Sequence, residues 1–185
     1  MKGFIAGVVC TGLALGLGVY VYFAGGFVPV ATAAQAMPFE KRLARIGLAA
    51  HVEKEAPTTV PIEANEENLV GGSHIYAEHC AVCHGLPDKP PTAIAQGMFP
   101  RPPKLLAGKG VTDDPPGESY WKIANGIRLT GMPAFNKNLS QTELWQVSLL
   151  VANADKLPAA ASAVLTQKPP ESAVATKHFT EPEAK

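Results

Sequence analysis

Hydrophobic residues dominate the first 30 positions of the chain, and charge does not interrupt them. No charged residue lies between Lys2 and Glu40, and the stretch from Phe4 to Val28 is almost wholly apolar. A helix rises about 1.5 Å per residue, so this stretch is long enough to cross a hydrocarbon core of about 30 Å. The pattern predicts a transmembrane helix within residues 1–30.

Two small-residue sequences after this stretch leave a second interpretation open. Ala31-Thr32-Ala33 and Ala34-Gln35-Ala36 resemble the site at which a signal peptide is cleaved. The apolar run is much longer than the usual signal core of about 7 to 15 residues, which favours a retained anchor over a cleaved signal. Either outcome exports the remainder of the chain.

A helical period follows between Pro38 and Glu55. Phe39, Leu43, Ile46 and Ala50 recur at spacings of four, three and four residues. This spacing predicts a helix with one apolar stripe and with proline in its first turn. The stripe fits either a membrane surface or a partner protein, and a solvated spacer helix is the alternative.

Three further helices are expected in the second half of the chain, and strand-like alternation is absent. One spans residues 66–79, and a short one spans residues 118–124. The last begins at Ser140, where Glu143 completes a capping box. Its inward stripe is Leu144, Val147, Ser148 and Val151. The fold class that these periods predict is all-α.

Composition divides the 185 residues into one domain and its appendages, because there is room for a single core of about 100 residues. We expect a membrane anchor or uncleaved signal at 1–30, a linker with an amphipathic helix at 31–64, a folded domain at 65–157 and a tail at 158–185. The Pro, Ala, Ser, Thr and Lys bias of the tail predicts disorder. A flexible linker of this length would span roughly 30 to 35 Å.

Charge and cysteine content narrow the function classes. The 16 basic and 16 acidic residues cancel, so no nucleic-acid partner is expected. Between Lys89 and Lys137, however, seven basic residues stand against three acidic ones, which suits an acidic partner patch. Three cysteines, at positions 10, 80 and 83, do not make a disulfide scaffold. Cys10 is interpreted as a plain thiol in the apolar segment.

The strongest chemical signal is the sequence Cys80-Ala81-Val82-Cys83-His84, a C-x-x-C-H motif typical of c-type haem attachment. Two thiols on one helical turn can reach the two vinyl groups of a porphyrin, and the adjacent imidazole can reach the iron. A zinc site would need a second ligand pair, and a redox dithiol would sit in a strand-rich chain. Neither context is present in the sequence.

Gly72, Tyr76 and Cys80 recur every four residues before this motif, and Thr130-Gly131-Met132-Pro133-Ala134-Phe135 follows it. With a closing amphipathic helix, this pattern resembles the class I cytochromes c over residues 65–157. The resemblance implies a small helical fold around one covalently bound haem c. It also implies that Gly72 lets the first and last helices cross closely, with Trp145 expected near Tyr76 and Gly72.

His84 and a second axial residue would ligate the iron. Met132 is the candidate for the second position, since its Gly-Met-Pro context presents the side chain and the resemblance assigns the ligand to this motif. Met98 is the alternative, but it follows His84 by only 14 residues. That short gap is better suited to a loop on the proximal side.

The resemblance implies a second set of residues around the haem. A carbonyl of the proline loop, at Pro102 or Pro103, would accept a hydrogen bond from His84 and orient its ring. Trp121 is expected to donate its indole hydrogen to a haem propionate, with core packing as the alternative, and either Trp121 or Tyr120 is expected to line the haem. From the residues themselves, Arg101 or Arg128 is a candidate to pair with a propionate through charge-assisted hydrogen bonds, with a solvated arginine as the alternative. The other histidines, His51, His74, His79 and His178, are expected at the surface.

With both axial positions filled, the iron has no place for a small-molecule substrate, so the sequence predicts an electron-transfer protein and not an enzyme. The resemblance implies haem attachment outside the cytoplasm, which places the domain in the periplasm beside a bacterial inner membrane that it spans once. Its partners would be the membrane and redox proteins or a respiratory complex. A tethered carrier, a fixed haem subunit, and an enzyme or gas sensor with an open sixth position remain the three hypotheses.

Overall fold

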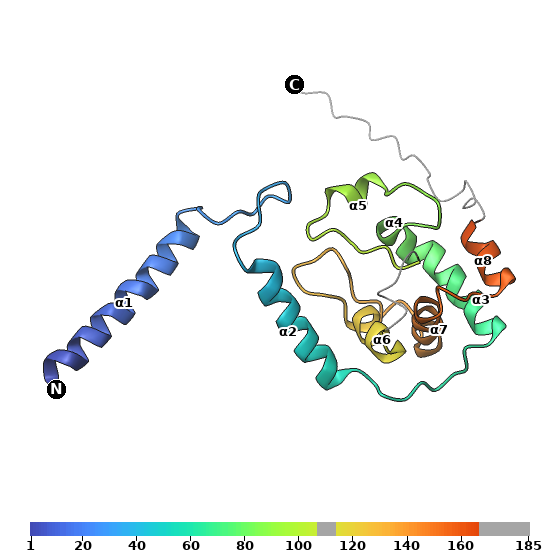
Figure 1. Ribbon diagram of the computed structural model, residues 1–185, viewed down its shortest axis with the longest axis horizontal. Helices are drawn as coiled ribbons and strands as arrows, with labels where there is room; N and C mark the ends of the chain where they lie inside the picture. The colour runs from blue at the N-terminus through green and yellow to red at the C-terminus, as the bar shows by residue number, and fades with distance from the viewer. Residues whose placement is uncertain (107–113, 167–185) are drawn as a thin grey trace, which may run out of the picture.

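The computed structural model describes residues 1–106 and 114–166 (Figure 1). Within these ranges the chain is helical and contains no strand, which confirms the predicted all-α class. The elements are α1 (Lys2–Ala24), α2 (Glu40–Glu55), α3 (Glu66–Ile75), a π-helical turn η1 (Tyr76–Cys80), α4 (Ala81–His84), α5 (Ala93–Gly97), α6 (Pro116–Asn125), α7 (Gln141–Ala152) and α8 (Ala159–Thr166).

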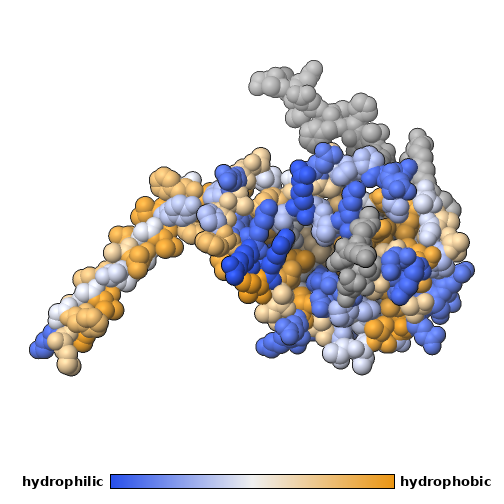
Figure 2. All heavy atoms as spheres, viewed as in Figure 1, coloured by the Kyte–Doolittle hydropathy of each residue, from blue (hydrophilic) through white to orange (hydrophobic). Residues whose placement is uncertain are grey.

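Helix α1 projects away from the other helices and buries none of its residues (Figure 1). Its mean hydropathy reaches 2.1, and its 23 residues are long enough to cross a membrane. In Figure 2 the helix is orange and white along its length, with blue only near its free end. The predicted apolar helix is confirmed, and a retained anchor and a signal peptide both meet this description.

Helix α2 begins two residues later than predicted, at Glu40, so Pro38 lies before the helix and not in its first turn. The backbone of Phe39 adopts a left-handed conformation with φ 65°, which turns the chain into the helix. The C-terminal end of α2 packs on α6, where Val52 is only 1% exposed. The segment 31–64 is therefore partly docked, and not a free linker along its whole length.

Helix α7 lies at the centre of the folded domain and packs against both α3 and α6 (Figure 1). Gly72 allows the crossing of α3 and α7, since a Cβ there would meet the backbone of Gln146 and the side chain of Leu150. The expected position of Trp145 is wrong. Its ring stacks on Tyr120 at 4.3 Å between centroids, because Trp145 projects from α7 toward α6.

The start of α7 confirms the predicted capping box. The Ser140 amide donates to Glu143 Oε2 at 2.7 Å, and the Glu143 amide donates to Ser140 Oγ at 3.3 Å. The Ser140 hydroxyl also donates to Glu143 Oε2 at 2.7 Å, and the two bonds from the Ser140 amide and hydroxyl hold the pKa of the Glu143 carboxyl below its ordinary value. The predicted inward stripe is also confirmed, because Leu144, Val147, Ser148 and Val151 are all buried.

Residues 159–166 correct the expectation of a tail that is disordered from 158 onward. They form α8, which packs on α3 and buries Ala161 and Leu165 completely or nearly so. The small residues of this segment suit close packing against α3, although composition alone reads as disorder. The remainder of the predicted tail, residues 167–185, lies outside the described residues.

A π-helical turn separates α3 from the short helix α4. The predicted continuous helix over 66–79 is thus interrupted at Tyr76, and η1 runs from there to Cys80. A π-turn accommodates one residue more than an α-turn, and such turns occur frequently at functional sites. Cys80 ends this turn, and α4 carries Cys83 and His84 directly after it.

Candidate haem site

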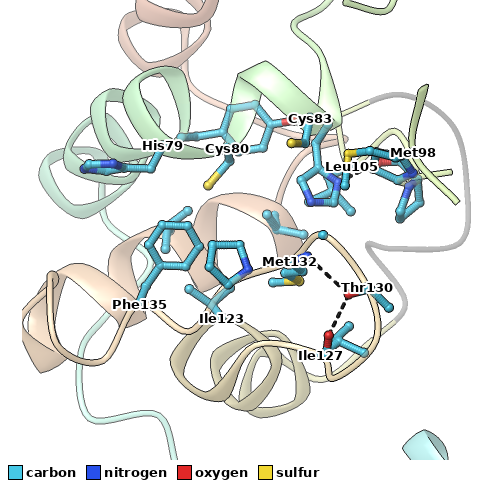
Figure 3. Close-up of a pocket in the computed structure, with 18 of the residues that line it drawn as sticks. His79, Cys80, Cys83, Met98, Leu105, Ile123, Ile127, Thr130, Met132 and Phe135 are labelled. Atoms are coloured by element: carbon cyan, nitrogen blue, oxygen red, sulfur yellow. Dashed lines mark hydrogen bonds between the residues drawn. The ribbon is translucent and has the colours of Figure 1, made fainter. Parts of the chain in front are cut away.

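Cys80 and Cys83 lie on one wall of a cavity in the folded domain (Figure 3), and the adjacent His84 also lines this cavity. Helix α4 stops immediately after His84, because Gly85 turns the chain with φ 80°. The Tyr76 hydroxyl donates to the Gly85 carbonyl at 2.8 Å, which ties the end of α4 back to the start of η1. The two thiols and the imidazole are therefore held on one short, closed segment.

Burial sets the protonation state of the first thiol. Removal from water raises the pKa of Cys80 to about 12, with a smaller contribution from the nearby Cys83. Burial also raises the pKa of the Tyr76 hydroxyl, with a smaller contribution from Cys80. Cys80 and Tyr76 are consequently neutral at physiological pH, and this wall of the cavity is apolar.

One ring nitrogen of His84 forms a hydrogen bond, and the other does not. Its Nδ1 lies 2.7 Å from the carbonyl oxygen of Pro103, and since a carbonyl only accepts, Nδ1 carries the hydrogen. The Nε2 lone pair remains for a metal, and the hydrogen bond orients the ring. Burial lowers the pKa of His84, with the Pro103 bond opposing it, so the imidazole is neutral. The acceptor is Pro103, while Pro102 lines the cavity.

Met132 projects from the wall opposite the cysteines (Figure 3). Thr130 holds its loop, because the Thr130 hydroxyl donates to the Ile127 carbonyl at 2.7 Å and accepts from the Met132 amide at 3.1 Å. The Ile127 amide in turn donates to the Met132 carbonyl at 3.1 Å. Gly126, at φ 67°, lies against this loop where a side chain would not fit. The thioether is thus presented from a braced loop.

Met98 lines the same cavity from the side, near Leu105 in Figure 3. It follows α5 and belongs to the loop that also carries Pro103, the partner of His84. Its methyl group reaches across to Gly131, where a Cβ would collide with it. Both methionines considered from the sequence therefore border the cavity, one on each of the two loops.

The donor set and the lining suit a haem c. Two thiols, one imidazole with an available nitrogen and a thioether face one cavity, whose other walls are formed largely by Ile123, Ile127, Leu105, Val147, Val151 and Phe135. Soft sulfur and imidazole ligands inside an apolar shell are the ligands and surroundings of iron in c-type cytochromes. Among the described residues, no group of three or more His, Cys, Asp or Glu forms an alternative metal site.

Sequence comparison decides the identity of this domain. Residues 67–149 match the family model described as cytochrome c oxidase, cbb3-type, subunit III. This part of the chain is a cytochrome c domain. The matched residues include the C-x-x-C-H motif and Met132, and the class I resemblance predicted from these residues is confirmed.

Comparisons with solved structures and with curated proteins give weaker matches or none. A chain of the Kuenenia stuttgartiensis reducing HAO-like protein complex Kustc0457/Kustc0458 is 26% identical, with a TM-score of 0.46. The match covers 54% of our chain and 49% of that one, so our chain spans about half of its length. No curated protein matches the sequence.

Of the other residues predicted to surround the haem, some line the cavity and some do not. Arg101 lines the cavity of the cytochrome c domain, whereas Arg128 does not. The predicted role of Trp121 at a propionate is contradicted, because its indole donates to Glu55 Oε2 at 3.2 Å and the ring lies outside the cavity. Tyr120 is also outside the cavity, since it stacks on Trp145. Neither Trp121 nor Tyr120 therefore lines the haem site.

Two aromatic rings and a histidine take that place instead. Tyr76 and Phe135 line the cavity, and both were visible in the motifs quoted from the sequence. His79, expected at the surface, borders the cavity with its ring 6.0 Å from that of Phe135. The position of His79 directly before Cys80 was the signal that could have indicated this. A regular α-helical period points His79 away from the cavity, and the sequence did not predict the π-turn that changes its direction.

Proposed function

We propose that this protein transfers single electrons through one haem c, attached to Cys80 and Cys83 and ligated by His84 and Met132. The observation that carries the proposal is that His84, with Nε2 available, and Met132 line one cavity, in which Met132 lies opposite the adjacent Cys83 (Figure 3). When bound, the haem would accept and release one electron. The chain contains only this one pair of cysteines outside α1, which supports a single attachment site.

The chain's own residues favour rapid exchange. The apolar lining excludes water, and the braced loops around Met132 and Pro103 restrict ligand movement, so little reorganisation accompanies a change of iron charge. A thioether opposite an imidazole favours the reduced state and raises the potential. With both ligands in place, no small-molecule substrate would reach the metal, which argues for electron transfer over catalysis.

We further propose that α1 anchors the domain on the periplasmic face of a bacterial inner membrane as a tethered carrier in a respiratory chain. Support comes from the length and hydropathy of α1. Basic residues at the cavity favour an acidic partner patch, since Arg101 lines it and Lys104 and Arg128 are exposed directly beside lining residues. Lys89 and Lys137 are also exposed. Lys122 contributes less, because it pairs with Asp114 and Glu118 at 3.4 and 3.3 Å.

A fixed haem subunit of a membrane complex is the second candidate function. Docking of α2 on α6 shortens the connection to α1 to the 15 residues 25–39, which as a flexible coil span only about 20 Å. Thr32 and Ala33 of this connection also border a small pocket with the loop at Gly97 and Arg101. The matching family description likewise names an oxidase subunit.

Optical spectra of the reduced holoprotein, with and without carbon monoxide, test the axial ligands. We expect wild type to show a sharp low-spin c-type spectrum that is indifferent to the gas, and Met132→Ala to bind it. Met98→Ala is the matched control, since it truncates the other methionine of the cavity and should leave the spectrum unchanged. Gas binding by wild type would move catalysis or sensing ahead of electron transfer. Gas binding by Met98→Ala alone would transfer the ligand role to Met98.

A further inference from the structure

Helix α2 has two faces that differ in what covers them. Leu43 and Val52 are nine residues apart, which is about two and a half helical turns, so they point in opposite directions. Val52 is 1% exposed, whereas Leu43 is 67% exposed. Ile46 shares the side of Leu43 and is 56% exposed, and Phe39, directly before the helix, is 70% exposed. The predicted apolar stripe therefore faces away from the cytochrome c domain.

Contacts at both ends prevent the helix from turning this stripe inward. At the C-terminal end, the Trp121 indole donates to Glu55 at 3.2 Å, and the His51 ring lies 5.5 Å from that of Trp121. At the N-terminal end, Lys41 Nζ lies 5.3 Å from the centre of the Phe99 ring, within cation–π range. Burying the stripe against the domain would break all of these contacts.

The position of the stripe along the chain indicates what covers it. It begins 15 residues after α1 ends, and the connection itself exposes Phe27 and Val30. Arg42 and Lys54 border the stripe on the same side as the acidic Glu40 and Glu53. The Glu40 carboxylate already accepts from the Met37 amide at 2.8 Å. An exposed apolar stripe with charged borders, close after a helix long enough to cross a membrane, is the pattern of helices that lie in the membrane interface.

We infer that the outward face of α2, formed by Leu43 and Ile46 together with Phe39 just before the helix, lies in the lipid headgroup region beside the membrane exit of α1. This role depends on the proposed membrane attachment of α1. Because the opposite face of α2 is docked on α6, the contact holds the cytochrome c domain in one orientation at the membrane. The domain then does not swing freely on its connection.

This orientation has a consequence for the electron partner. Lys41 contacts Phe99, whose neighbours Met98 and Arg101 line the haem cavity. The membrane-bound helix and the cavity loop are thus in direct contact, and the haem is held near the membrane plane. The partner that fits this arrangement is an integral membrane protein whose redox centre lies close to the membrane surface.

Spin-label accessibility tests the inference on full-length holoprotein in vesicles of phosphatidylcholine and phosphatidylglycerol. In a Cys10→Ser background the haem thioethers protect the other cysteines, so Leu43→Cys takes the only label. Glu67→Cys, exposed on α3, is the matched control. We expect the ratio of oxygen to nickel-chelate accessibility at position 43 to exceed that at position 67 several-fold. Ile46→Cys should repeat the result at a second position of the stripe.

Two outcomes would overturn the inference. Equal, water-like accessibility at positions 43 and 67 would mean that the stripe is solvated. Protection of position 43 from both oxygen and nickel would mean that protein covers it, and in this purified system that protein is a second copy of the chain. Flotation with the vesicles after an alkaline wash, and the reduced spectrum of the same samples, report separately on the anchor and on the haem.

Discussion

Individual glycines decide how closely the elements of this protein approach one another. At Gly72 an added Cβ would meet the backbone of Gln146, which cannot move without separating α3 from α7. At the adjacent Gly71 it would meet only the Gln146 side-chain amide, at 3.0 Å, and that group can rotate away. The two positions therefore make a matched pair.

We predict that Gly72→Ala lowers the free energy of unfolding by about 1 to 3 kcal/mol through overpacking of the helix crossing. Gly71→Ala should be close to neutral, because the gain in helix propensity offsets the displacement of Gln146. Urea unfolding of the holoprotein followed by far-UV circular dichroism measures both. Equal losses at the two positions would contradict a crossing centred on Gly72.

At this scale the sequence was a good guide wherever a residue acts through a motif. The C-x-x-C-H motif, Met132 and Gly72 were all identified from local patterns; the motif and Met132 line one cavity, and Gly72 lies at the crossing of α3 and α7. Trp121 was misplaced because its partner, Glu55, is 66 residues away in the chain. No local pattern reports such a contact, and a large ring fits a haem pocket and a helix interface equally well.

The elements depend on their ends as well as on their packed faces. Helix α7 begins with the Ser140–Glu143 capping box, which satisfies amide groups that a helix terminus leaves unpaired. Helix α8 lacks any such predicted start and is held by Ala161 and Leu165 against α3. Different substitutions should therefore destabilise α7 and α8: loss of the cap for α7 and loss of a buried side chain for α8.

We predict that Ser140→Ala costs about 1 kcal/mol of stability at neutral pH. The Glu143 pKa is lower in the folded protein than in the unfolded chain, so its contribution is present above the unfolded pKa and is lost as the pH falls through the folded value. Unfolding midpoints of wild type should therefore decline on acidification more than those of Glu143→Gln. Parallel pH profiles for the two proteins would show that the capping box carries no pH dependence.

For α8 we predict that Leu165→Ala costs about 2 to 5 kcal/mol, as for other fully buried leucines. Ala163→Ser, on the exposed side of the same helix, is the control and should change stability little. Thermal unfolding of the holoprotein provides the comparison. An unchanged midpoint for Leu165→Ala would mean that the domain ends before α8, as the composition of this segment first indicated.

At the scale of the whole molecule, α2 joins the membrane segment to the cytochrome c domain. Its register against α6 follows from Val52 and from Gly117, where a Cβ would collide with the Pro57 carbonyl. The helical period located α2 correctly, but the period could not tell which face would be covered. That choice depends on α6, which lies about 60 residues further along the chain.

We predict that Val52→Asp releases α2 from α6 and lets the helix unfold, so that trypsin can cleave its backbone after the already exposed Arg42 and Arg45, with the haem spectrum unchanged. Leu43→Asp places the same charge on the opposite face of α2 and should leave tryptic cleavage in detergent as in wild type. Rates of cleavage within 40–55, followed by mass spectrometry, test both. Equal cleavage of wild type and Val52→Asp would mean that Val52 does not hold the helix.

The number of residues in the π-helical turn η1 sets the orientation of Cys80, Cys83 and His84 relative to the helix crossing at Gly72. Each residue of an α-helix advances the chain by about 100° around the axis. Inserting or deleting one residue in η1 would therefore rotate Cys80, Cys83 and His84 together relative to Gly72, which is committed to its crossing with α7. A substitution in η1 keeps this orientation, whereas an insertion or deletion would turn the attachment residues away from Met132.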